Sequence, residues 1–210
     1  MKKGLFLSFE GGEGAGKSTQ VKALKKYIEE SLKREVLLTR EPGGSPLSEE
    51  IRKLLLDKKF TSMHARTEAL LMAASRAQHV EEVLRPALAQ GKIILCDRYW
   101  DASRAYQGVG RGLGLKAIDM INAWATNELH SDRCYIFKLD PKEGFKRVSK
   151  REDSELDRLE KESLDFHQKV QAAYLFLAKS HPKHYKVIDA SKGAVEIQKV
   201  LITDLNKILS

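Results

Sequence analysis

The sequence predicts a three-layer α/β fold, in which a five-stranded parallel sheet carries helices on both faces. Short apolar runs rich in branched residues alternate with longer segments of helical period along the whole chain. Such a strand, helix, strand series is typical of a parallel sheet covered on both sides. No Pro/Ser-rich linker interrupts the series, and 210 residues suffice for one substantial core. We therefore expect a single domain spanning residues 1–210.

Five apolar runs are the expected strands, at 5–9, 36–38, 93–96, 135–139 and 187–188. Two apolar stripes predict amphipathic helices. Near the N-terminus, apolar residues repeat at three and four positions, at Val21, Leu24, Ile28 and Leu32. A similar stripe near the C-terminus comprises Val195, Val200, Leu201, Leu205 and Ile208.

Local signals mark where two further helices begin or end. Ser45 places a capping hydroxyl before Pro46, so a helix should start there. A longer helical stretch is expected over 64–90, with a kink at Pro86 and a left-handed stop at Gly91.

Composition limits the partners. Lys+Arg 37 against Asp+Glu 29 gives a net charge of +8, which suits anionic ligands. The excess is scattered, without a dense basic tract interleaved with aromatics, which argues against nucleic acid. Neither a membrane span nor an export signal is visible. Cys96 and Cys134 lie far apart without metal-binding spacing, so we expect buried thiols in a cytoplasmic protein.

The strongest single motif matches G-x-x-x-x-G-K-S/T and follows a predicted strand and precedes a predicted helix. Its glycines let consecutive backbone N–H groups face an anion, and the next helix adds its positive end. Lys17 is expected to reach the β- and γ-phosphates of ATP, and Ser18 to offer its hydroxyl to Mg²⁺. The expected ATP-binding residues are Gly11, Gly12, Glu13, Gly14, Ala15, Gly16, Lys17, Ser18 and Thr19.

Two alternatives fit this motif less well than an ATP-binding P-loop does. A glycine-rich turn with an incidental lysine would leave the correct flanks unexplained. A GTPase would need Asn-Lys-x-Asp and Asp-x-x-Gly, and neither occurs. The motif alone does not distinguish the remaining phosphate-binding enzymes.

A second phosphate site is expected where Asp97 and Arg98 follow the predicted strand 93–96. Strand ends of a parallel sheet line the ligand crevice. Asp97 is placed there to orient Mg²⁺ or its waters, and the guanidinium of Arg98 to clamp a second phosphate. The alternative is an ordinary surface pair at a strand end, and the upstream P-loop favours the functional interpretation.

Together these motifs give a family resemblance. The chain resembles bacterial thymidylate kinases in six blocks, in the same order and spacing: FEGGEGAGKST at 9–19, TREPGG at 39–44, RAQHVE at 76–81, DRY at 97–99, AYQG at 105–108 and ELDRLE at 155–160. The resemblance implies a P-loop kinase fold with a mobile lid, and transfer of the ATP γ-phosphoryl group to dTMP, which yields dTDP and ADP for dTTP biosynthesis. It also implies a homodimer packed through helices.

The resemblance assigns residues to the acceptor. Glu13 is implied to act at the deoxyribose 3′-hydroxyl or the nearby metal hydration, Arg76 at the thymine edge, and Arg98 at the dTMP phosphate. Arg40 is implied to contact phosphate from the loop 40–42, although a solvated loop arginine is an open alternative. Further implied pocket residues are Ser103, Tyr106 and Gln107, and turn packing is an alternative role for the last two.

One position departs from the family pattern. The family usually stacks a phenylalanine on thymine one helical turn before the base-reading arginine, and this chain has Met72 there. Methionine can lie against a ring through its polarizable sulfur. A core position on an amphipathic helix is the alternative for Met72.

The highly charged segment 147–158 buries little apolar surface and is expected to be a mobile lid. In the resembled family the lid closes over ATP and, when the P-loop has no arginine, carries the catalytic one. Arg151 is the predicted residue, with Arg147 and Lys150 as rivals. A solvated charge run is the alternative for each.

The predicted chemistry is in-line phosphoryl transfer by positioning and charge neutralisation, with Lys17, Glu13, Arg98 and Arg151 as the catalytic set. No general base is needed, because the attacking phosphate oxygen is already anionic. The nearest alternative is a kinase acting on another nucleoside monophosphate, such as dUMP or dGMP. A more remote one is a nucleic-acid-binding ATPase, which would show nucleic-acid-stimulated hydrolysis.

Overall fold

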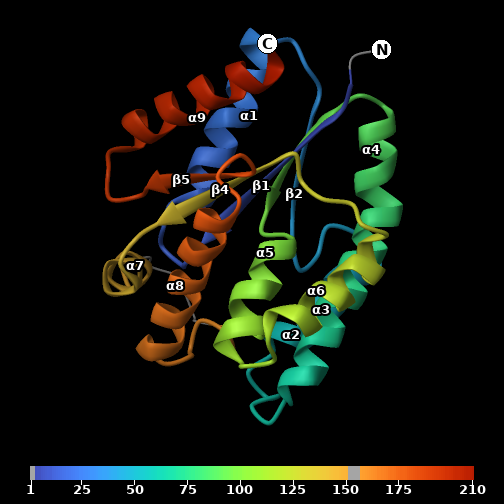
Figure 1. Cartoon of the computed structure of the whole chain (residues 1–210), viewed down its shortest axis with the longest axis vertical. Helices are drawn as coiled ribbons and strands as arrows, with labels where there is room; N and C mark the ends of the chain where they lie inside the picture. The colour runs from blue at the N-terminus through green and yellow to red at the C-terminus, as the bar shows by residue number, and fades with distance from the viewer. Residues whose placement is uncertain (1–2, 151–156) are drawn as a thin grey trace.

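A computed structural model describes residues 3–150 and 157–210 (Figure 1). Its described part contains one five-stranded parallel sheet in the order β2-β3-β1-β4-β5. The strands are β1 (Leu5–Gly11), β2 (Val36–Arg40), β3 (Ile93–Asp97), β4 (Arg133–Lys138) and β5 (Tyr185–Asp189). All five predicted strands and the parallel sheet are confirmed, with bounds that differ from the expected ones by up to two residues.

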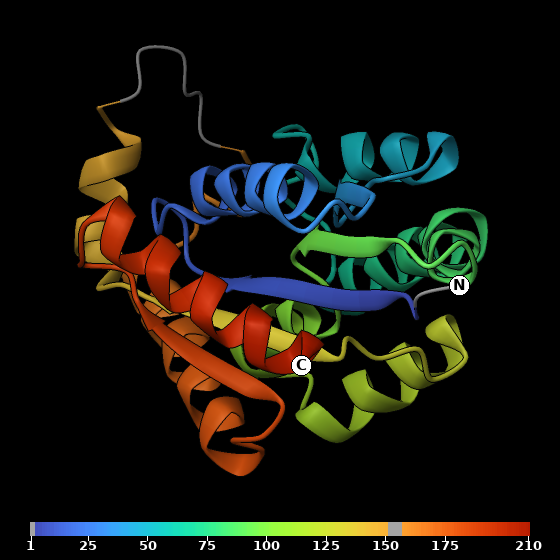
Figure 2. The same cartoon turned by 90° about the horizontal axis from the view of Figure 1, so that it is seen from above.

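The sheet is buried on both faces because apolar side chains point both ways along its strands. On β1, Leu5, Leu7 and Phe9 pack into one core cluster, while Phe6 packs into another on the opposite face. Helices α1 (Lys17–Ser31) and α9 (Ala194–Leu209) cover the first face. Figure 2 shows α1 in blue on one side of the sheet and α8 in orange on the other.

The second face carries the remaining helical segments that pack on the sheet. Helix α8 (Leu164–Ser180) lies over β4 and β5, and α4 (Arg85–Ala89) lies over β3. Around them are α2 (Pro46–Leu56), α3 (Ala65–His79), η1 (Val80–Leu84), α5 (Trp100–Ser103), η2 (Arg104–Gly110), α6 (Leu115–Thr126) and α7 (Pro141–Val148). The three-layer architecture predicted from the sequence is therefore confirmed.

Helix α2 begins as its sequence predicts. The Ser45 hydroxyl accepts a hydrogen bond from the backbone N–H of Ser48, and Pro46 is the first helical residue. The expected helix 64–90 is instead three segments, since the π-helical η1 separates α3 from α4. The N–H of Arg85 bonds to the carbonyl of Val80, five residues back, directly before Pro86, which has no N–H to donate. Gly91 adopts the predicted left-handed conformation.

The apolar stripe predicted for the last helix is partly wrong. Val195 is 72% exposed and Val200 is 39% exposed, while Ile197 is buried. The buried positions Ile197, Leu201 and Leu205 recur every four residues, so the helix turns a slightly different face toward the sheet.

Both cysteines are buried thiols, as expected. Burial raises the pKa of Cys96 and Cys134 well above the ordinary value. Within residues 3–150 and 157–210, no helix is both long and apolar enough to cross a membrane.

Candidate active site

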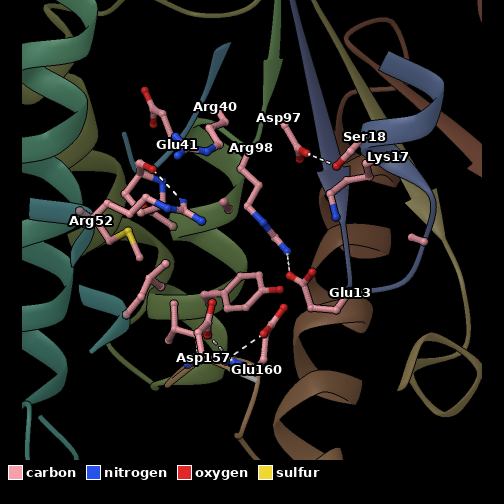
Figure 3. Close-up of a pocket in the computed structure, with 18 of the residues that line it drawn as sticks. Glu13, Lys17, Ser18, Arg40, Glu41, Arg52, Asp97, Arg98, Asp157 and Glu160 are labelled. Carbon is pink, nitrogen blue, oxygen red and sulfur yellow. Dashed lines mark hydrogen bonds and ion pairs between the residues drawn. The ribbon is translucent and has the colours of Figure 1, made fainter. Parts of the chain in front are cut away.

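A cavity of about 270 Å³ opens at the carboxyl ends of β1, β2 and β3. The residues after these strands line it together with side chains from α2, α3, α5 and η2 and with residues of the segment 157–160. This is the edge at which ligands bind in open parallel sheets. Figure 3 shows the cavity with Lys17 and Ser18 on one side and Arg40 and Arg52 on the other.

The P-loop forms one side of this cavity. Gly16 adopts a left-handed conformation with φ 80°, and α1 starts at Lys17 without any side-chain cap or acidic residue in its first turn. The N–H groups at this helix end are therefore free to bind an anion. Seven of the nine predicted ATP-binding residues line the cavity, namely Glu13, Gly14, Ala15, Gly16, Lys17, Ser18 and Thr19.

The other two predicted residues, Gly11 and Gly12, lie beneath the loop. Their carbonyl oxygens accept hydrogen bonds from the Lys17 ammonium at 3.0 and 2.9 Å. Burial lowers the pKa of Lys17, and repulsion from the Arg98 guanidinium lowers it further. A side chain at Gly14, where φ is 69°, would collide with the carbonyl of Gly144 on α7, so only glycine fits there.

Asp97 and Ser18 meet at the edge of the P-loop. The Ser18 hydroxyl donates to Oδ2 of Asp97 at 3.0 Å, and Oδ1 of Asp97 is buried with no partner among the described residues. Hydroxyl and carboxylate oxygens are the ligands that Mg²⁺ takes, usually one or two per site beside phosphates and waters. The two residues therefore fit a Mg²⁺ ion. Elsewhere in the described chain, no group of three His, Cys, Asp or Glu residues could hold a metal.

Arg98 follows Asp97 and has an unusual backbone conformation for a non-glycine residue, with φ 69°. Its N–H bonds to the carbonyl of Phe9 at 2.9 Å. Its guanidinium crosses the cavity to Glu13, to which it donates through Nη2, as Figure 3 shows. Nη1 is buried without a partner in the described part of the chain. One donor group of Arg98, which lines the cavity, is thus unused among the described residues.

Glu13 is held ionised by its surroundings. Burial by itself raises the pKa of this carboxyl, but the nearby charges of Arg98 and Lys17 outweigh burial and lower the pKa to about 2. A carboxylate between two cations reduces their mutual repulsion while no phosphate is bound. The sequence predicted Glu13 as a site residue, but did not predict this ion pair.

Glu10 is a buried carboxyl on β1, directly before the P-loop; it lies in the resembling block 9–19, but sequence reasoning gave it no role. It is fully buried, and its two oxygens accept from the backbone N–H of Tyr99 and the hydroxyl of Tyr174, each at 2.7 Å. Burial is the main cause that raises the pKa of Glu10 to about 7, and the charge of Asp101 adds to it. Glu10 thus ties the residue after Arg98 to helix α8.

The opposite side of the cavity contains the predicted acceptor residues. Met72, Arg76, Ser103, Tyr106 and Gln107 all line it. They are buried as well: Arg76 is 2% exposed and Gln107 is 1% exposed. The packing alternatives also describe part of this geometry: Met72 is 8% exposed, Tyr106 belongs to a core cluster, and Gln107 bonds to Glu68, while all three line the cavity from α3 and η2.

The polar groups on this side bond mainly to one another. Arg76 donates to Glu41, Ser103, Asn122 and the carbonyl of Tyr99. Gln107 donates to Glu68 at 2.8 Å. The hydroxyl of Tyr106 is buried without a partner in the residues described, and the Arg98 guanidinium lies 5.0 Å from its ring centre.

Comparison with known proteins identifies the family. The family model described as thymidylate kinase matches residues 9–201. The chain belongs to the thymidylate kinase family. It is 47% identical over 195 residues to a thymidylate kinase of Lactobacillus delbrueckii subsp. bulgaricus, covering 93% of this chain and 92% of the relative. It is 48% identical over 195 residues to a thymidylate kinase of Geobacillus sp., with the same coverage.

A solved member of the family has the same fold. The crystal structure of thymidylate kinase from Ehrlichia chaffeensis superposes with a TM-score of 0.79 at 28% identity, covering 97% of this chain and 99% of that one. The P-loop kinase fold expected from the sequence is therefore confirmed.

Arg40 lies on a strand and not in the loop where it was expected. It is the last residue of β2 and not a loop residue, and it forms a two-bond ion pair with Glu49 at 2.7 and 3.1 Å. Its side chain is 45% exposed and lines the cavity. The Arg40 side chain is thus partly in solvent and partly against the cavity.

The predicted lid falls partly outside the described residues. Arg151, the predicted catalytic arginine, lies in the segment 151–156, which the structure does not describe. Neither of its rivals, Arg147 and Lys150, lines the cavity. Arg147 donates to the carbonyl of Ala190 at 3.1 Å.

The structure also adds cavity residues that sequence reasoning missed. Arg52 and Leu56 come from α2, and Asp157, Leu159 and Glu160 follow the undescribed segment. The helical period after Pro46 placed Arg52 on a helix, but nothing in the sequence indicated which face met the cavity. Asp157 and Glu160 belong to one of the six resembling blocks, which was the signal that could have found them.

Proposed function

We propose that this chain transfers the γ-phosphoryl group of ATP to the 5′-phosphate of dTMP, yielding dTDP and ADP. The observation that carries the proposal is one cavity lined by the P-loop and by two further arginines, Arg98 and Arg76, which could bind a second ligand. The relatives at 47% and 48% identity over 93% of the chain are named thymidylate kinases, which supports dTMP as the acceptor. Residues 1–210 would act as one catalytic domain.

On the donor side, the free N–H groups of the P-loop and the first turn of α1 would bind the β- and γ-phosphates. Lys17 adds the positive charge, and Thr19 lies beside them in the cavity. Ser18 and Asp97 would hold Mg²⁺, which supplies neutralisation of negative charge on the phosphates.

On the acceptor side, Arg98 would bind the phosphate of dTMP. Its Nη1 has no partner among the described residues, and its Nη2 donates to the carboxylate of Glu13. Glu13 would act at the 3′-hydroxyl of the acceptor sugar or at the nearby metal hydration, as the family resemblance implies, and Arg40 would contact phosphate. Arg76 would donate to the base above Met72, with Ser103, Tyr106 and Gln107 around the sugar and base.

These groups position two anions in line and offset their charge, so the rate gain comes from orientation and electrostatics. The attacking oxygen needs no base because it is already anionic. Arg151 is proposed as the lid arginine that completes the charge neutralisation when the segment 147–158 closes.

The assembly proposed is a cytoplasmic homodimer. Adjacent helices α3 and α6 expose apolar side chains of which Trp124 is 88%, Met120 66% and Leu70 58% exposed. A second copy of the chain would cover this face. Light scattering of the purified protein at several concentrations tests the dimer.

The deciding experiment is ADP release from ATP and Mg²⁺ with a panel of monophosphate acceptors. We expect turnover with dTMP to exceed that with dUMP, dGMP and dCMP, and no stimulation by DNA or RNA. A preference for dUMP or dGMP would support the alternative kinase, and acceptor-independent, nucleic-acid-stimulated hydrolysis would support an ATPase.

A further inference from the structure

A buried chain of hydrogen bonds stands behind Arg76. The guanidinium donates from Nε to Oε2 of Glu41 at 2.7 Å, and the other carboxylate oxygen, Oε1, lies 2.9 Å from Nδ1 of His79. Nε2 of His79 lies 2.8 Å from the hydroxyl of Thr39 on β2. Thr39, His79 and Glu41 are called the supporting chain below. The supporting chain connects β2 to the base-directed end of the cavity.

His79 is remote from the cavity although it belongs to the same helix as Arg76. Its side chain is 0% exposed and does not line the cavity. Glu41 and Arg76 are 3% and 2% exposed, so their ion pair is shielded from water. A buried ion pair is stable only when its remaining lone pairs and hydrogens are satisfied. His79 satisfies the second oxygen of Glu41.

The hydrogen positions follow from the chemistry of the groups. An ionised carboxylate only accepts, so Nδ1 of His79 must carry the hydrogen that points to Glu41. The Thr39 hydroxyl can donate to Nε2 and thereby fix the ring in this tautomer. Glu41 thus determines which nitrogen of His79 donates, Thr39 satisfies the other nitrogen, and His79 in turn holds the second oxygen of Glu41.

The loop that follows β2 packs closely against the His79 ring. Gly44 has φ 90°, and any side chain there would collide with the His79 ring. The adjacent Gly43 donates its N–H to Ser75 on α3 at 3.2 Å. The loop after β2 therefore closes directly over the imidazole and leaves it little freedom to rotate.

Arg76 itself has little freedom left. Nη1 donates to Ser103 at 3.1 Å and to Asn122 at 2.5 Å, and Nη2 donates to the carbonyl of Tyr99 at 2.9 Å. Of its five N–H hydrogens, one on Nη2 has no partner among the described residues. Because Arg76 lines the cavity, that hydrogen is the one available to a ligand.

We propose that His79 is a positioning and specificity-determining residue, which holds Arg76 through Glu41 so that one fixed N–H faces the base of the acceptor. This inference rests on the proposed function. A fixed donor selects a base with a keto oxygen at that point over one with an amino group, since thymine presents an acceptor at C4 and cytosine a donor. The choice of base then depends on a residue that never touches it.

Acceptor selectivity should respond to a change at His79 more than the rate does. His79→Leu removes the donor to Glu41, so Arg76 can rotate. We expect KM for dTMP to rise about tenfold, and the kcat/KM preference for dTMP over dCMP to fall about tenfold. KM for ATP should stay within about twofold, since the P-loop lies at the other side of the cavity.

A matched pair of variants separates positioning from folding. In His79→Asn the amide nitrogen takes the place of Nδ1 and can still donate to Glu41, whereas in His79→Gln it reaches toward Thr39 and leaves Glu41 without a donor. We expect Asn to retain most of the dTMP preference and Gln to lose it as Leu does. Thr39→Val should shift the preference in the same direction but less. The control is Gln78→Ala, at the position next to His79, which removes a surface hydrogen bond to Glu82.

The measurement is kcat and KM for dTMP, dCMP and ATP in each variant, with thermal melting to compare folded stability. Equal dTMP over dCMP preference in wild type and all folded His79 variants would overturn this inference while leaving the proposed function intact. Asn and Gln losing selectivity equally would also overturn it. Should the wild-type chain fail to phosphorylate dTMP at all, the proposed function fails, and this inference with it.

Discussion

The two sides of the cavity are built in opposite ways. On the donor side, polar groups are left open: the first turn of α1 has no side-chain cap, and Oδ1 of Asp97 has no partner among the described residues. On the acceptor side, most polar groups are bonded to one another, as in the four bonds of Arg76, although the hydroxyl of Tyr106 has no partner among the described residues. Open groups bind phosphate and metal by charge, and bonded groups present a fixed outline.

Arg98 lies between the donor and acceptor sides of the cavity, and its removal should reduce activity more than any other substitution considered below. Arg98→Ala removes the guanidinium that both pairs with Glu13 and is free to bind a second phosphate. We expect kcat with dTMP to fall about 10³-fold with an unchanged circular dichroism spectrum. Steady-state ADP release measures this, with Arg66→Ala on the exposed start of α3 as the control. A loss below about threefold would contradict the role of Arg98.

Glu10 bonds to the backbone of Tyr99 and to Tyr174 on α8. Its ionisation should make the free energy of unfolding depend on pH. Its folded pKa of about 7 lies above the ordinary 4.5, so the folded chain holds a proton that the unfolded chain has lost between these values. Stability from this group is complete below about pH 4.5 and falls by roughly 3 kcal/mol as pH rises through 7.

Glu10→Gln removes this titration while keeping an oxygen for the N–H of Tyr99. Thermal melts at pH 5, 6, 7 and 8 should show similar melting temperatures at low pH, because the amide resembles the protonated carboxyl, and a wild-type melting temperature that falls below that of the variant as pH rises. Parallel curves for the two proteins would show that Glu10 does not titrate in this range.

On the donor side, Asp97→Asn tests the open carboxylate. The amide keeps one oxygen near Ser18 but loses the charge. We expect the Mg²⁺ concentration for half-maximal turnover to rise about tenfold, with KM for dTMP little changed. An unchanged Mg²⁺ requirement would separate Asp97 from the metal.

On the acceptor side, Met72 is the least constrained residue and should give the smallest effect. Met72→Phe offers a flat ring and is expected to lower KM for dTMP about two- to threefold, because aromatic stacking has more fixed geometry than a thioether contact. Met72→Ala should raise KM by a similar factor. Acceptor titrations at saturating ATP measure both, and equal KM values in all three proteins would place the base elsewhere.

The same contrast explains what the sequence could predict. The P-loop is local: its glycines, Lys17 and Ser18 lie within eight residues, so one motif indicated both geometry and ligand. The strands were also predictable, because residues buried on both faces form continuous apolar runs. Asp97 and Arg98 were found since strand ends converge on one edge.

The acceptor side depends on contacts between segments far apart in the chain. His79 lies 38 residues from Glu41 and 40 from Thr39. All three belong to the resembling blocks 39–44 and 76–81, but membership of a block did not indicate that their side chains bond to one another. Glu10 resembled any polar residue at the end of a strand until its burial was known. The burial of Ile197 instead of Val195 depends on the angle at which α9 crosses the sheet, which apolar periodicity alone does not determine.

The two tryptophans of the chain lie in contrasting surroundings. Trp100 is 7% exposed and packs against His130, whereas the indole of Trp124 is 88% exposed on α6. Their emission should therefore differ, since an indole in water emits at longer wavelength than a buried one. Fluorescence from Trp124 thus provides an intrinsic reporter for that surface, which shifts to shorter wavelength when the indole is covered and requires no added dye.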